Sequence, residues 1–298
     1  MNNLEFIVEK EAVGLKIRDY LKHHKGLSSR LIRGAAPEGR IKVNGNVVKL
    51  NYIIKEGENI SVDINKKESQ NIEAEDMPLD IVYEDEDVLV VNKPPFMVVH
   101  PTRKHNAGTL SNGVIYHFKE NKSASVVRLV SRLDMNTSGL IIIAKNQYSH
   151  AKLSESMKLP EFKKYYRAVV HGSFENEFGT IDLPIYYPGE EFIKRVVDDR
   201  GQQSVTHYKV IKRYAEATLL ELLLETGRTH QIRVHLEHMG HPIYGDELYS
   251  IYDDSEIIKR QALHAYALEF PHPRTGNIIR LKSDIPEDIK SLMKELKL

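Results

Sequence analysis

A carboxylate and an arginine stand two residues apart in the segment 131–139, SRLDMNTSG, directly before an apolar run from 140 to 144. The run has the length and composition of a buried strand. The Asn, Thr, Ser and Gly residues before it are typical of a turn. The positive charge of Arg132 can also keep the Asp134 carboxylate ionised, ready to act as a nucleophile or base. The segment is therefore either an ordinary turn or an active-site loop.

A second candidate lies in the segment 223–246, LLETGRTHQIRVHLEHMGHPIYGD, where basic and polar side chains are dense. Thr229 can cap a helix, and a helix N-terminus that carries arginines favours anions. A metal site is the rival interpretation, but the segment has no HExxH pattern. We expect packed histidines here and no metal. The side chains that could bind a substrate are Arg228, His230, Gln231 and Arg233.

Two further segments carry weaker signals. In NKPPFMVVHP, residues 92–101, Lys93 and His100 could contact phosphate, although a rigid proline turn explains the segment equally well. In EFKKYYRAVVHG, residues 161–172, a β-rich run begins with two tyrosines that alternate across a strand. Tyr166 could stack on a nucleic-acid base, but ordinary strand packing is the default for such a residue.

The composition limits the classes of protein and site. The 298-residue chain has a formal net charge of zero and no cysteine, which excludes disulfides, thiolate metal sites and cysteine nucleophiles. We expect a cytoplasmic protein without a signal peptide or membrane span, because no run reaches about 18 apolar residues. Neither GxGxxG nor a P-loop occurs, so we expect no nucleotide cofactor.

Charge is distributed unevenly along the chain. Residues 14–49 contain nine Lys and Arg against two acidic residues, whereas residues 68–87 contain nine acidic residues and no basic one. This change of sign predicts a basic module over 1–65, an acidic linker over 66–80 and a main domain over 81–298.

The basic module has a compact pattern of elements. Apolar spacing from Leu15 to Leu21 predicts a helix, Ser28 or Ser29 caps a second one, and Asn44-Gly45 predicts a hairpin. The segments GLKIRDYL, LSSRLIRGAAPEGRIKVNGNVVK and IKEGENISV resemble a small α/β S4-like RNA-binding domain. The resemblance implies a basic face for structured RNA, formed by Lys22, Arg30, Arg33, Arg40 and Lys42.

The main domain is richer in strands than in helices. The predicted strands follow a first hairpin at 81–93 and cover 139–145, 164–171, 205–213, 217–225 and 263–270. The predicted helices cover 147–158, 229–239 and 285–297. This order favours an α+β fold with a mixed, mainly antiparallel sheet.

The order of NKPPFMVVHP, RLDMNTSGL, KYYRAVVHG, TGRTHQIRVHLEHMGHPIYGD and LHAYALEFPHP resembles the RluA-type pseudouridine synthases, specifically RluD-like members with an S4-like domain. The resemblance implies conversion of uridine to pseudouridine in RNA without a cofactor or a metal. It implies that Asp134 is the catalytic carboxylate, Arg233 its basic partner and Tyr166 the ring that packs on the base. It implies that Arg132 fills the gap left by the displaced uridine. The substrate-binding candidates are Arg132, Thr137, Arg228, His230, Gln231, Lys93 and His100.

Two departures from the family pattern are present. Ser131 stands where the family often has histidine, and Gln202 stands where lysine often follows the glycine. We expect a monomer that acts on large-subunit (23S) ribosomal RNA. The open alternatives are a tRNA pseudouridine synthase, a non-catalytic RNA-binding or ribosome-assembly factor, and a metal-dependent hydrolase.

Overall fold

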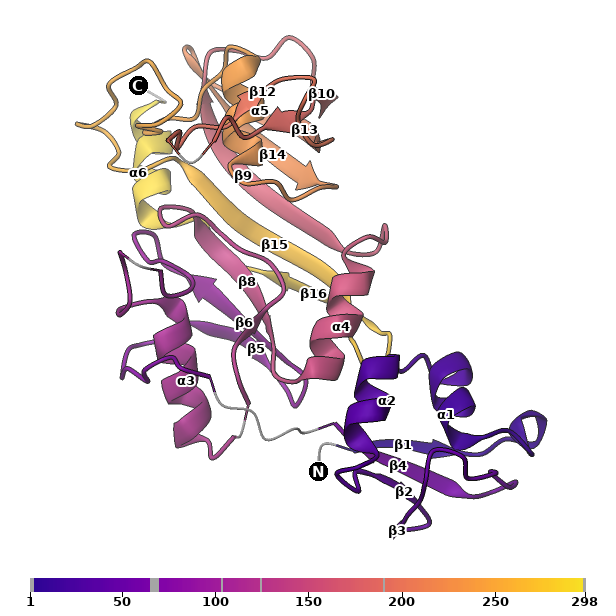
Figure 1. The fold of residues 1–298 in the computed structure, drawn as a ribbon. Coiled ribbons are helices and arrows are strands. Elements are labelled where there is room, and N and C mark those ends of the chain that lie inside the picture. Colours follow the sequence, from indigo (N-terminus) through magenta and orange to yellow (C-terminus); the bar gives the residue numbers. More distant parts are fainter. Residues whose placement is uncertain (1–2, 65–69, 103, 124, 190, 297–298) are drawn as a thin grey trace.

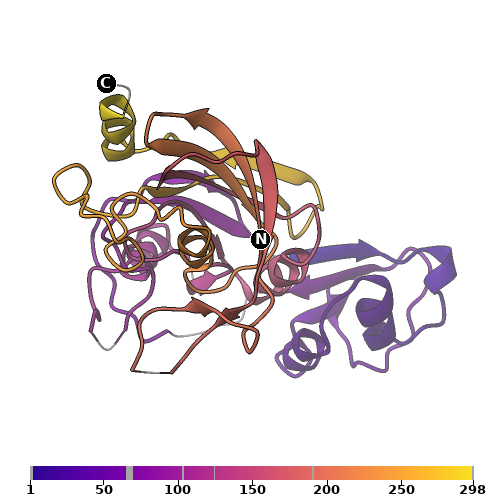
Figure 2. The same ribbon diagram turned by 90° about the horizontal axis from the view of Figure 1, so that it is seen from above.

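The computed structural model describes residues 3–64, 70–102, 104–123, 125–189 and 191–296. Figure 1 shows a small N-terminal sheet with two short helices beside a much larger curved sheet. Figure 2 shows that the N-terminal part lies to one side of the large sheet and does not stack upon it. No helix in the described ranges is both long and apolar enough to cross a membrane.

The N-terminal part has a core of its own. Ser28 accepts a hydrogen bond from Leu31 N at 3.2 Å and starts a helix whose buried side faces the sheet. Asn44 and Gly45 have φ angles of 48° and 82°, as the predicted tight hairpin requires. In sheet order the strands are β1 (Asn3–Ile7), β4 (Asn59–Asp63), β2 (Ile41–Val43) and β3 (Asn46–Val47). The helical elements are η1 (Lys10–Ala12), α1 (Ile17–Asp19), η2 (Tyr20–His24) and α2 (Ser29–Ala35).

The large sheet is mixed and mainly antiparallel, as predicted. Its strand order is β10-β13-β14-β9-β15-β8-β6-β5, with β16 on β15 and β7 on β8. Only β8 and β15 are parallel among the described pairs. The bounds are β5 (Ile81–Glu84), β6 (Val88–Lys93), β7 (Arg128–Leu129), β8 (Ser138–Ala144), β9 (Lys163–His171), β10 (Phe178–Asp182), β13 (Val205–Arg213), β14 (Ala217–Leu224), β15 (Leu263–Pro271) and β16 (Ile278–Lys282). A separate hairpin pairs β11 (Ile185–Tyr186) with β12 (Val196–Val197).

Helices cover both faces of the sheet. Alternate residues of β6 and β8 pack under α3 (Leu110–Glu120) on one face and under α4 (Gln147–Ser156) on the other. This explains why β8 is buried along its whole length. Helices α5 (Gln231–His238) and α6 (Glu287–Glu295) pack on β9 and β14 through a third core.

The expected acidic linker is partly docked. Its described part, residues 70–80, packs the side chains of Ile72 and Leu79 against the α3 core. Asn112 in α3 donates to the Glu73 carbonyl at 2.9 Å and accepts from the Glu75 amide at 3.2 Å. Residues 65–69 lie outside the described residues. The segment therefore combines an acidic composition with defined contacts to the large domain.

The N-terminal part contacts the large domain near α4. Tyr148 of α4 packs against the N-terminal core, and the amine of Lys152 lies close to Gly26. Arg274 donates to the Asn3 carbonyl at 2.8 Å and forms an ion pair with buried Asp87 at 2.7 Å. Figure 1 shows α2 directly beside α4. The two parts are joined by specific contacts as well as by the chain.

Candidate active site

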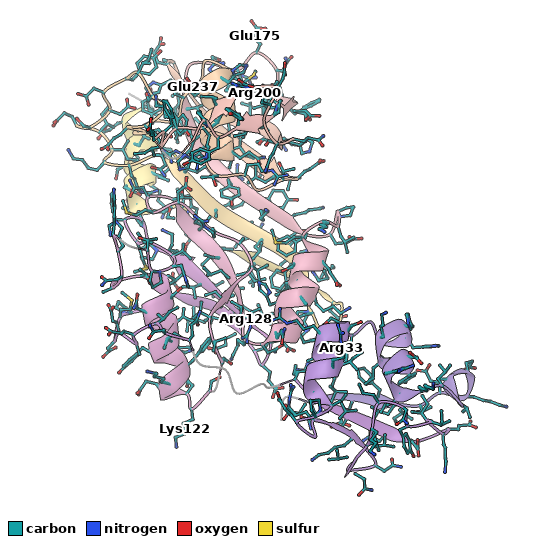
Figure 3. The ribbon with its side chains drawn as sticks, viewed as in Figure 1. Arg33, Lys122, Arg128, Glu175, Arg200 and Glu237 are labelled. Carbon is teal, nitrogen blue, oxygen red and sulfur yellow. The ribbon has the colours of Figure 1, made fainter. Side chains whose placement is uncertain are left out.

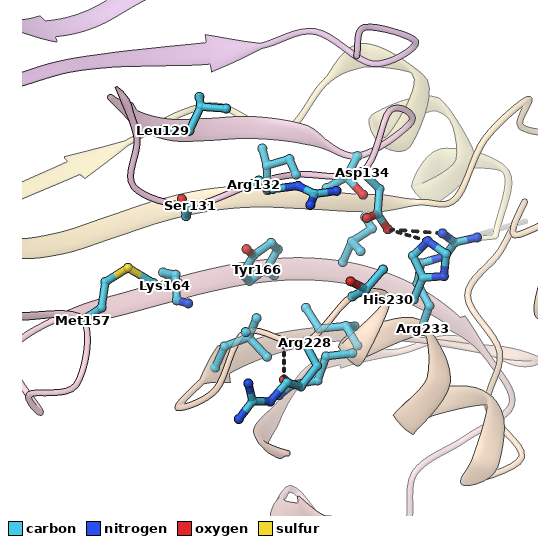
Figure 4. Close-up of a pocket in the computed structure, with 18 of the residues that line it drawn as sticks. Leu129, Ser131, Arg132, Asp134, Met157, Lys164, Tyr166, Arg228, His230 and Arg233 are labelled. Atoms are coloured by element: carbon cyan, nitrogen blue, oxygen red, sulfur yellow. Dashed lines mark hydrogen bonds and ion pairs between the residues drawn. The ribbon is translucent and has the colours of Figure 1, made fainter. Parts of the chain in front are cut away.

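The Asp134 loop enters the sheet at the parallel junction between β8 and β15. Gly139 has a φ of 116°, and a Cβ there would come within 2.3 Å of the Ala265 carbonyl oxygen. Only glycine permits this approach. The register places Ser138 opposite His264. The loop 131–137 is consequently fixed over the middle of the sheet, above Tyr166 of β9 (Figure 4).

This loop and three other segments enclose a cavity of about 370 Å³. A nucleoside fits a space of this order. Figure 4 shows Asp134 and Arg132 on one wall, Tyr166 and Lys164 on β9, and the 227–233 segment opposite. The predicted residues that line the cavity are Arg132, Asp134, Thr137, Tyr166, Arg228, His230, Gln231 and Arg233.

Asp134 faces the cavity and contacts two basic side chains. Its Oδ2 accepts from Arg233 Nη1 at 3.2 Å and lies 3.9 Å from His230 Nε2. Arg233 also donates through Nε and Nη2 to both oxygens of Asp246, each at 2.7 Å. Burial opposes the charge of Arg233, but Asp246 and Asp134 raise its pKa overall. Asp134 therefore has a permanently charged arginine beside it.

His230 stands between Asp134 and a tyrosine. It has a left-handed backbone, with φ 59°, and its Nδ1 lies 2.9 Å from the Tyr249 hydroxyl. Burial, followed by the charges of Arg233 and Arg195, lowers the pKa of His230 although Asp134 opposes this. The imidazole is therefore mainly neutral at neutral pH, so the charge on Asp134 is balanced by Arg233.

Tyr166 forms the floor of the cavity. Its side chain is buried, and this burial together with the Asp134 charge raises the pKa of the phenol. The phenol is neutral at physiological pH. It can pack on a base or donate a hydrogen bond, but it does not supply a phenolate base at neutral pH.

Arg132 and Arg228 are the exposed basic residues at the mouth of the cavity. No ion pair involving either side chain occurs among the described residues, and Arg228 Nε donates to the Gln203 carbonyl at 3.3 Å. Free guanidinium groups in this position can contact phosphates or stack on bases.

The side chains of Thr137 and Gln231 are buried and act as supports. Thr137 Oγ1 accepts from Gln261 at 3.2 Å. Gln231 accepts from the Arg228 amide and donates to the Val205 carbonyl, so it fixes the 226–231 turn. The sequence predicts both residues at the site. In the structure both line the cavity, where their side chains bind neighbouring protein groups.

The structure contradicts the prediction that Lys93 contacts phosphate. Its side chain is fully buried, and Nζ donates to the carbonyls of Pro94, Met97 and Met135 at 2.8, 3.0 and 2.9 Å. Burial, with the charge of Arg260 second, lowers the pKa of Lys93 to about 7. Lys93 therefore holds the Asp134 loop from behind and does not reach a ligand in the cavity.

His100 lies in a neighbouring cavity. That cavity also borders on Arg132 and Asp134, and His100 Nδ1 lies 3.3 Å from the Ser111 hydroxyl. His100 is exposed and does not line the main cavity. From this position it can contact a polynucleotide outside the main cavity.

Four consecutive residues after Asp134 are held by buried side chains. Lys93 donates to Met135 O, Arg260 to Asn136 O at 3.2 Å, and Gln261 to Thr137 Oγ1. His264 Nδ1 lies 2.9 Å from Ser138 Oγ. Arg260 in turn forms a bidentate pair with Asp288 of α6, at 2.6 and 2.9 Å. This set of supports fixes the loop with little freedom.

Sequence reasoning missed several members of the site. Lys164 lines the cavity, and burial lowers its pKa. Asp246, the last residue of the 223–246 segment, is the main partner of Arg233. Tyr249 could not be found from the sequence, because an isolated tyrosine in a loop belongs to no motif that predicts a site.

Two histidines of the 223–246 segment, His235 and His241, have structural partners, whereas His238 is exposed and not packed as expected. His235 lies 2.9 Å from Thr206 Oγ1 and 3.0 Å from the Leu183 carbonyl, and His241 Nδ1 lies 2.9 Å from the His171 carbonyl. Within the described ranges, no cluster of three or more His, Cys, Asp or Glu residues is arranged to hold a metal.

The predicted RNA-binding residues of the N-terminal part do not share one face. Lys22, Arg30 and Arg33 are exposed on the helical side, and Figure 3 labels Arg33 on α2. Lys42 is exposed between buried Ile41 and Val43, so it points from the opposite face of the sheet. Arg40 is bound to Glu38 at 2.7 Å and to the Asp63 carbonyl at 2.8 Å.

Comparisons with known proteins agree with this site. Residues 87–238 match the family described as RNA pseudouridylate synthase. The uncharacterized RNA pseudouridine synthase YjbO of Bacillus subtilis is 41% identical over 90% of this chain and 95% of its own. The ribosomal large subunit pseudouridine synthase D of Pseudomonas aeruginosa is 36% identical over 89% of this chain and 87% of its own.

A solved structure shares the fold. The structure of human RNA pseudouridylate synthase domain containing 4 covers 73% of this chain and 92% of its own, with a TM-score of 0.60 and 23% identity. The fold, the extent of the sequence match and the family model agree, and this chain belongs to the RluA-type family of RNA pseudouridine synthases.

Proposed function

We propose that this enzyme isomerises uridines of large-subunit (23S) ribosomal RNA and that Asp134 is its catalytic carboxylate. The observation that carries the proposal is the position of Asp134. It lies at the wall of a nucleoside-sized cavity, where its carboxylate accepts a hydrogen bond from the Arg233 guanidinium at 3.2 Å.

The residues have complementary roles in the proposed reaction. The N1–C1′ bond of uridine breaks, a C5–C1′ bond forms, the proton leaves C5 and N1 gains one. Asp134 acts on the ribose as an ionised group, and Arg233 holds its charge and direction. Tyr166 packs its neutral ring on the base. The reaction needs no redox step, because atoms and electrons balance within the nucleoside and water.

Arg132 has a separate role in access to the uridine. A base within folded RNA must leave its stack, which costs a few kcal/mol. The exposed guanidinium of Arg132 stands next to Asp134 at the mouth of the cavity (Figure 4). We infer that it occupies the space left by the displaced base, where a planar cation stacks well.

The substrate class and domain roles extend the proposal. A relative named ribosomal large subunit pseudouridine synthase D matches most of this chain, which favours ribosomal over transfer RNA. Residues 1–65 are proposed as an S4-like RNA-binding domain, 66–80 as a linker and 81–298 as the catalytic domain. The exposed cations Lys22, Arg30 and Arg33 would contact structured RNA. We propose that the enzyme works as a monomer in the cytoplasm.

Release of tritium from RNA labelled at C5 of uridine tests this proposal. The wild type should release tritium from a 23S rRNA transcript, whereas Asp134→Asn should lose at least about 10⁴-fold in rate and retain RNA affinity. Asp182→Asn, an exposed residue on β10, is the matched control and should keep full activity.

The other outcomes separate the alternatives. Tritium release from a tRNA pool, without release from the 23S rRNA transcript, would identify tRNA as the substrate in place of rRNA. Tight binding without release from either pool would favour a non-catalytic RNA-binding factor. Metal-dependent cleavage of the transcript without tritium release would favour a metal-dependent hydrolase. Retained turnover in Asp134→Asn would refute the assigned role of that carboxylate.

A further inference from the structure

A second cavity of about 490 Å³ adjoins the reaction cavity. The β11–β12 hairpin forms one side, and residues 200–202 form another. The two cavities share the turn of Gly227, Arg228 and Thr229. A polynucleotide whose uridine occupies the first cavity can therefore reach the second cavity by passing Arg228.

The second cavity contains two stacked arginine–tyrosine pairs. The guanidinium carbon of Arg195 lies 3.7 Å from the ring centroid of Tyr187, and that of Arg200 lies 4.4 Å from the ring centroid of Tyr186. Such planar groups offer faces on which a base can stack irrespective of its sequence.

The charges in the cavity are only partly balanced. Asp198 accepts two hydrogen bonds from Arg200, at 2.7 and 2.8 Å, and neutralises it. In contrast, no ion pair of Arg195 or Arg228 is found in the part of the chain that the structure describes. The cavity therefore presents two uncompensated guanidinium groups to a ligand, and such groups favour phosphate.

The walls of the cavity are held rigidly before any ligand binds. A Cβ on Gly201 would come within 2.4 Å of the Ile185 carbonyl carbon, so the backbone packs there as closely as glycine allows. The Arg195 amide donates to the Tyr249 hydroxyl at 2.8 Å. Tyr249 also contacts His230 at 2.9 Å, and His230 lies next to Asp134. The hairpin is thus linked to the reaction site by two hydrogen bonds.

We propose that the second cavity binds the nucleotide that adjoins the target uridine in the RNA strand. Its base stacks on the platform of Tyr187 and Arg195. Its phosphate lies between Arg195 and Arg228. The proposal rests on the proposed function for the class of ligand, and it adds a second nucleotide site that fixes the direction of the strand.

Binding of single-stranded oligouridylates to the full-length protein tests the proposal. Fluorescein-labelled oligomers of two, four and six nucleotides are titrated at several salt concentrations, and anisotropy gives the affinity. Arg195→Met should weaken binding of the six-nucleotide oligomer roughly tenfold and flatten its salt slope by about 0.7 for the lost phosphate contact. Tyr187→Ala should weaken binding by a similar factor with an unchanged slope, because stacking carries no charge.

Lys122→Met is the matched control for the lost charge. Figure 3 shows Lys122 at the far end of the molecule from Arg200. The control should change the affinity less than twofold. In a second measurement, an oligouridylate with one 4-thiouridine beside its central uridine is irradiated, and peptides covering 185–200 should carry the cross-link.

The outcomes separate this proposal from the proposed function. Equal effects of Arg195→Met and Lys122→Met, with no cross-link in 185–200, would overturn the nucleotide site. Neither readout depends on isomerisation. The variants could weaken oligouridylate binding as expected, and the cross-link could form in 185–200, while the wild type releases no tritium. That combination would refute the proposed reaction and leave the nucleotide site intact.

Discussion

Beside Asp134, the buried arginine has two fixed partners. Arg233 is almost completely buried and binds both Asp134 and Asp246. On the helical side of the N-terminal domain, two cations have the opposite environment. Lys22 and Arg30 are exposed, and the described residues include no ion pair for either of them.

The difference reflects two uses of charge. A buried ion pair costs several kcal/mol of desolvation per ion, and it persists only with close partners that define one geometry. An exposed cation keeps its water, adapts to many phosphate positions and is screened by salt. Loss of a buried partner should therefore abolish chemistry and reduce stability together. Loss of a surface cation should reduce affinity by degrees.

The largest effect is expected from Arg233→Met. The change leaves Asp246 buried without its partner, and it removes the cation beside Asp134. The free energy of unfolding should fall by about 3–5 kcal/mol, measured by urea denaturation. Tritium release should fall by at least about 10²-fold.

Arg280→Met is the control for this change, since Arg280 is exposed and has only one long ion pair, at 3.7 Å. Its stability should stay within about 0.5 kcal/mol of the wild type. Wild-type stability and turnover in Arg233→Met would show that the buried network is dispensable.

The second effect concerns pH and His264. Burial, with the charge of Arg260 second, lowers the pKa of His264 from its ordinary value of 6.5 to about 4. Between these values the unfolded chain binds a proton that the folded protein excludes. Stability should therefore fall as the pH drops from 6.5, by about 3 kcal/mol in total at pH 4.

Urea denaturation across this pH range checks the effect. His264→Gln cannot titrate, so its stability should decline less steeply than that of the wild type, although it is lower at pH 7 because the contacts with Ser138 and Ser283 change. Parallel curves for the two proteins would mean that another group causes the acid sensitivity.

The third effect concerns the exposed cations of the N-terminal domain. Replacing Lys22, Arg30 and Arg33 together with glutamine should weaken binding to a folded rRNA fragment by about tenfold or more and flatten its salt dependence. Turnover of a short stem-loop should change little. Lys42→Gln provides the control, because Lys42 points from the opposite face of the sheet.

Deletion of residues 1–65 also tests whether the N-terminal domain binds structured RNA, but it changes more than the surface charge. It should weaken binding to structured RNA more than turnover of short stem-loops, but it also uncovers Tyr148 of α4. Equal losses on both substrates would count against a separate RNA-binding role for the N-terminal domain.

The smallest effect is expected at Gln202, in the second cavity. This exposed residue lines the second cavity, where it adds no charge. Gln202→Lys should tighten binding of the six-nucleotide oligouridylate by about threefold at low salt, with a steeper salt slope. An unchanged affinity would mean that the bound strand does not approach this side chain.

Much of the sheet was predictable from local pattern. The predicted strand at 205–213 and the strand β13 coincide, and the predicted helix at 147–158 corresponds to α4. Helix α3 was missed because its first turns carry Ser111, Asn112 and Gly113, which are poor helix formers in isolation. They are buried there, and Gly113 lies against Met77 and Leu79 of the docked acidic segment. Tertiary packing overrides the local preference.

The sequence predicts which residues belong to the site better than it predicts what each of them contacts. The quoted motifs led to Asp134, Tyr166 and Arg233, and the fold brings these residues from separate segments to one cavity. Lys93 was misassigned because burial is a tertiary property, and sequence gives no warning that its amine is surrounded by carbonyls. Arg260 was missed for the same reason, since its partner Asp288 lies far along the chain.

The link between Arg260 and Asp288 also sets an order of events during synthesis. The loop that carries Asp134 is made early, but one of its supports reaches back from α6, close to the last residues of the chain. At about 5–20 residues per second, translation needs on the order of ten seconds to pass from Asp134 to Asp288. During that interval the loop that carries Asp134 lacks this support. The support that α6 gives to the Asp134 loop is therefore completed only after Asp288 has been translated.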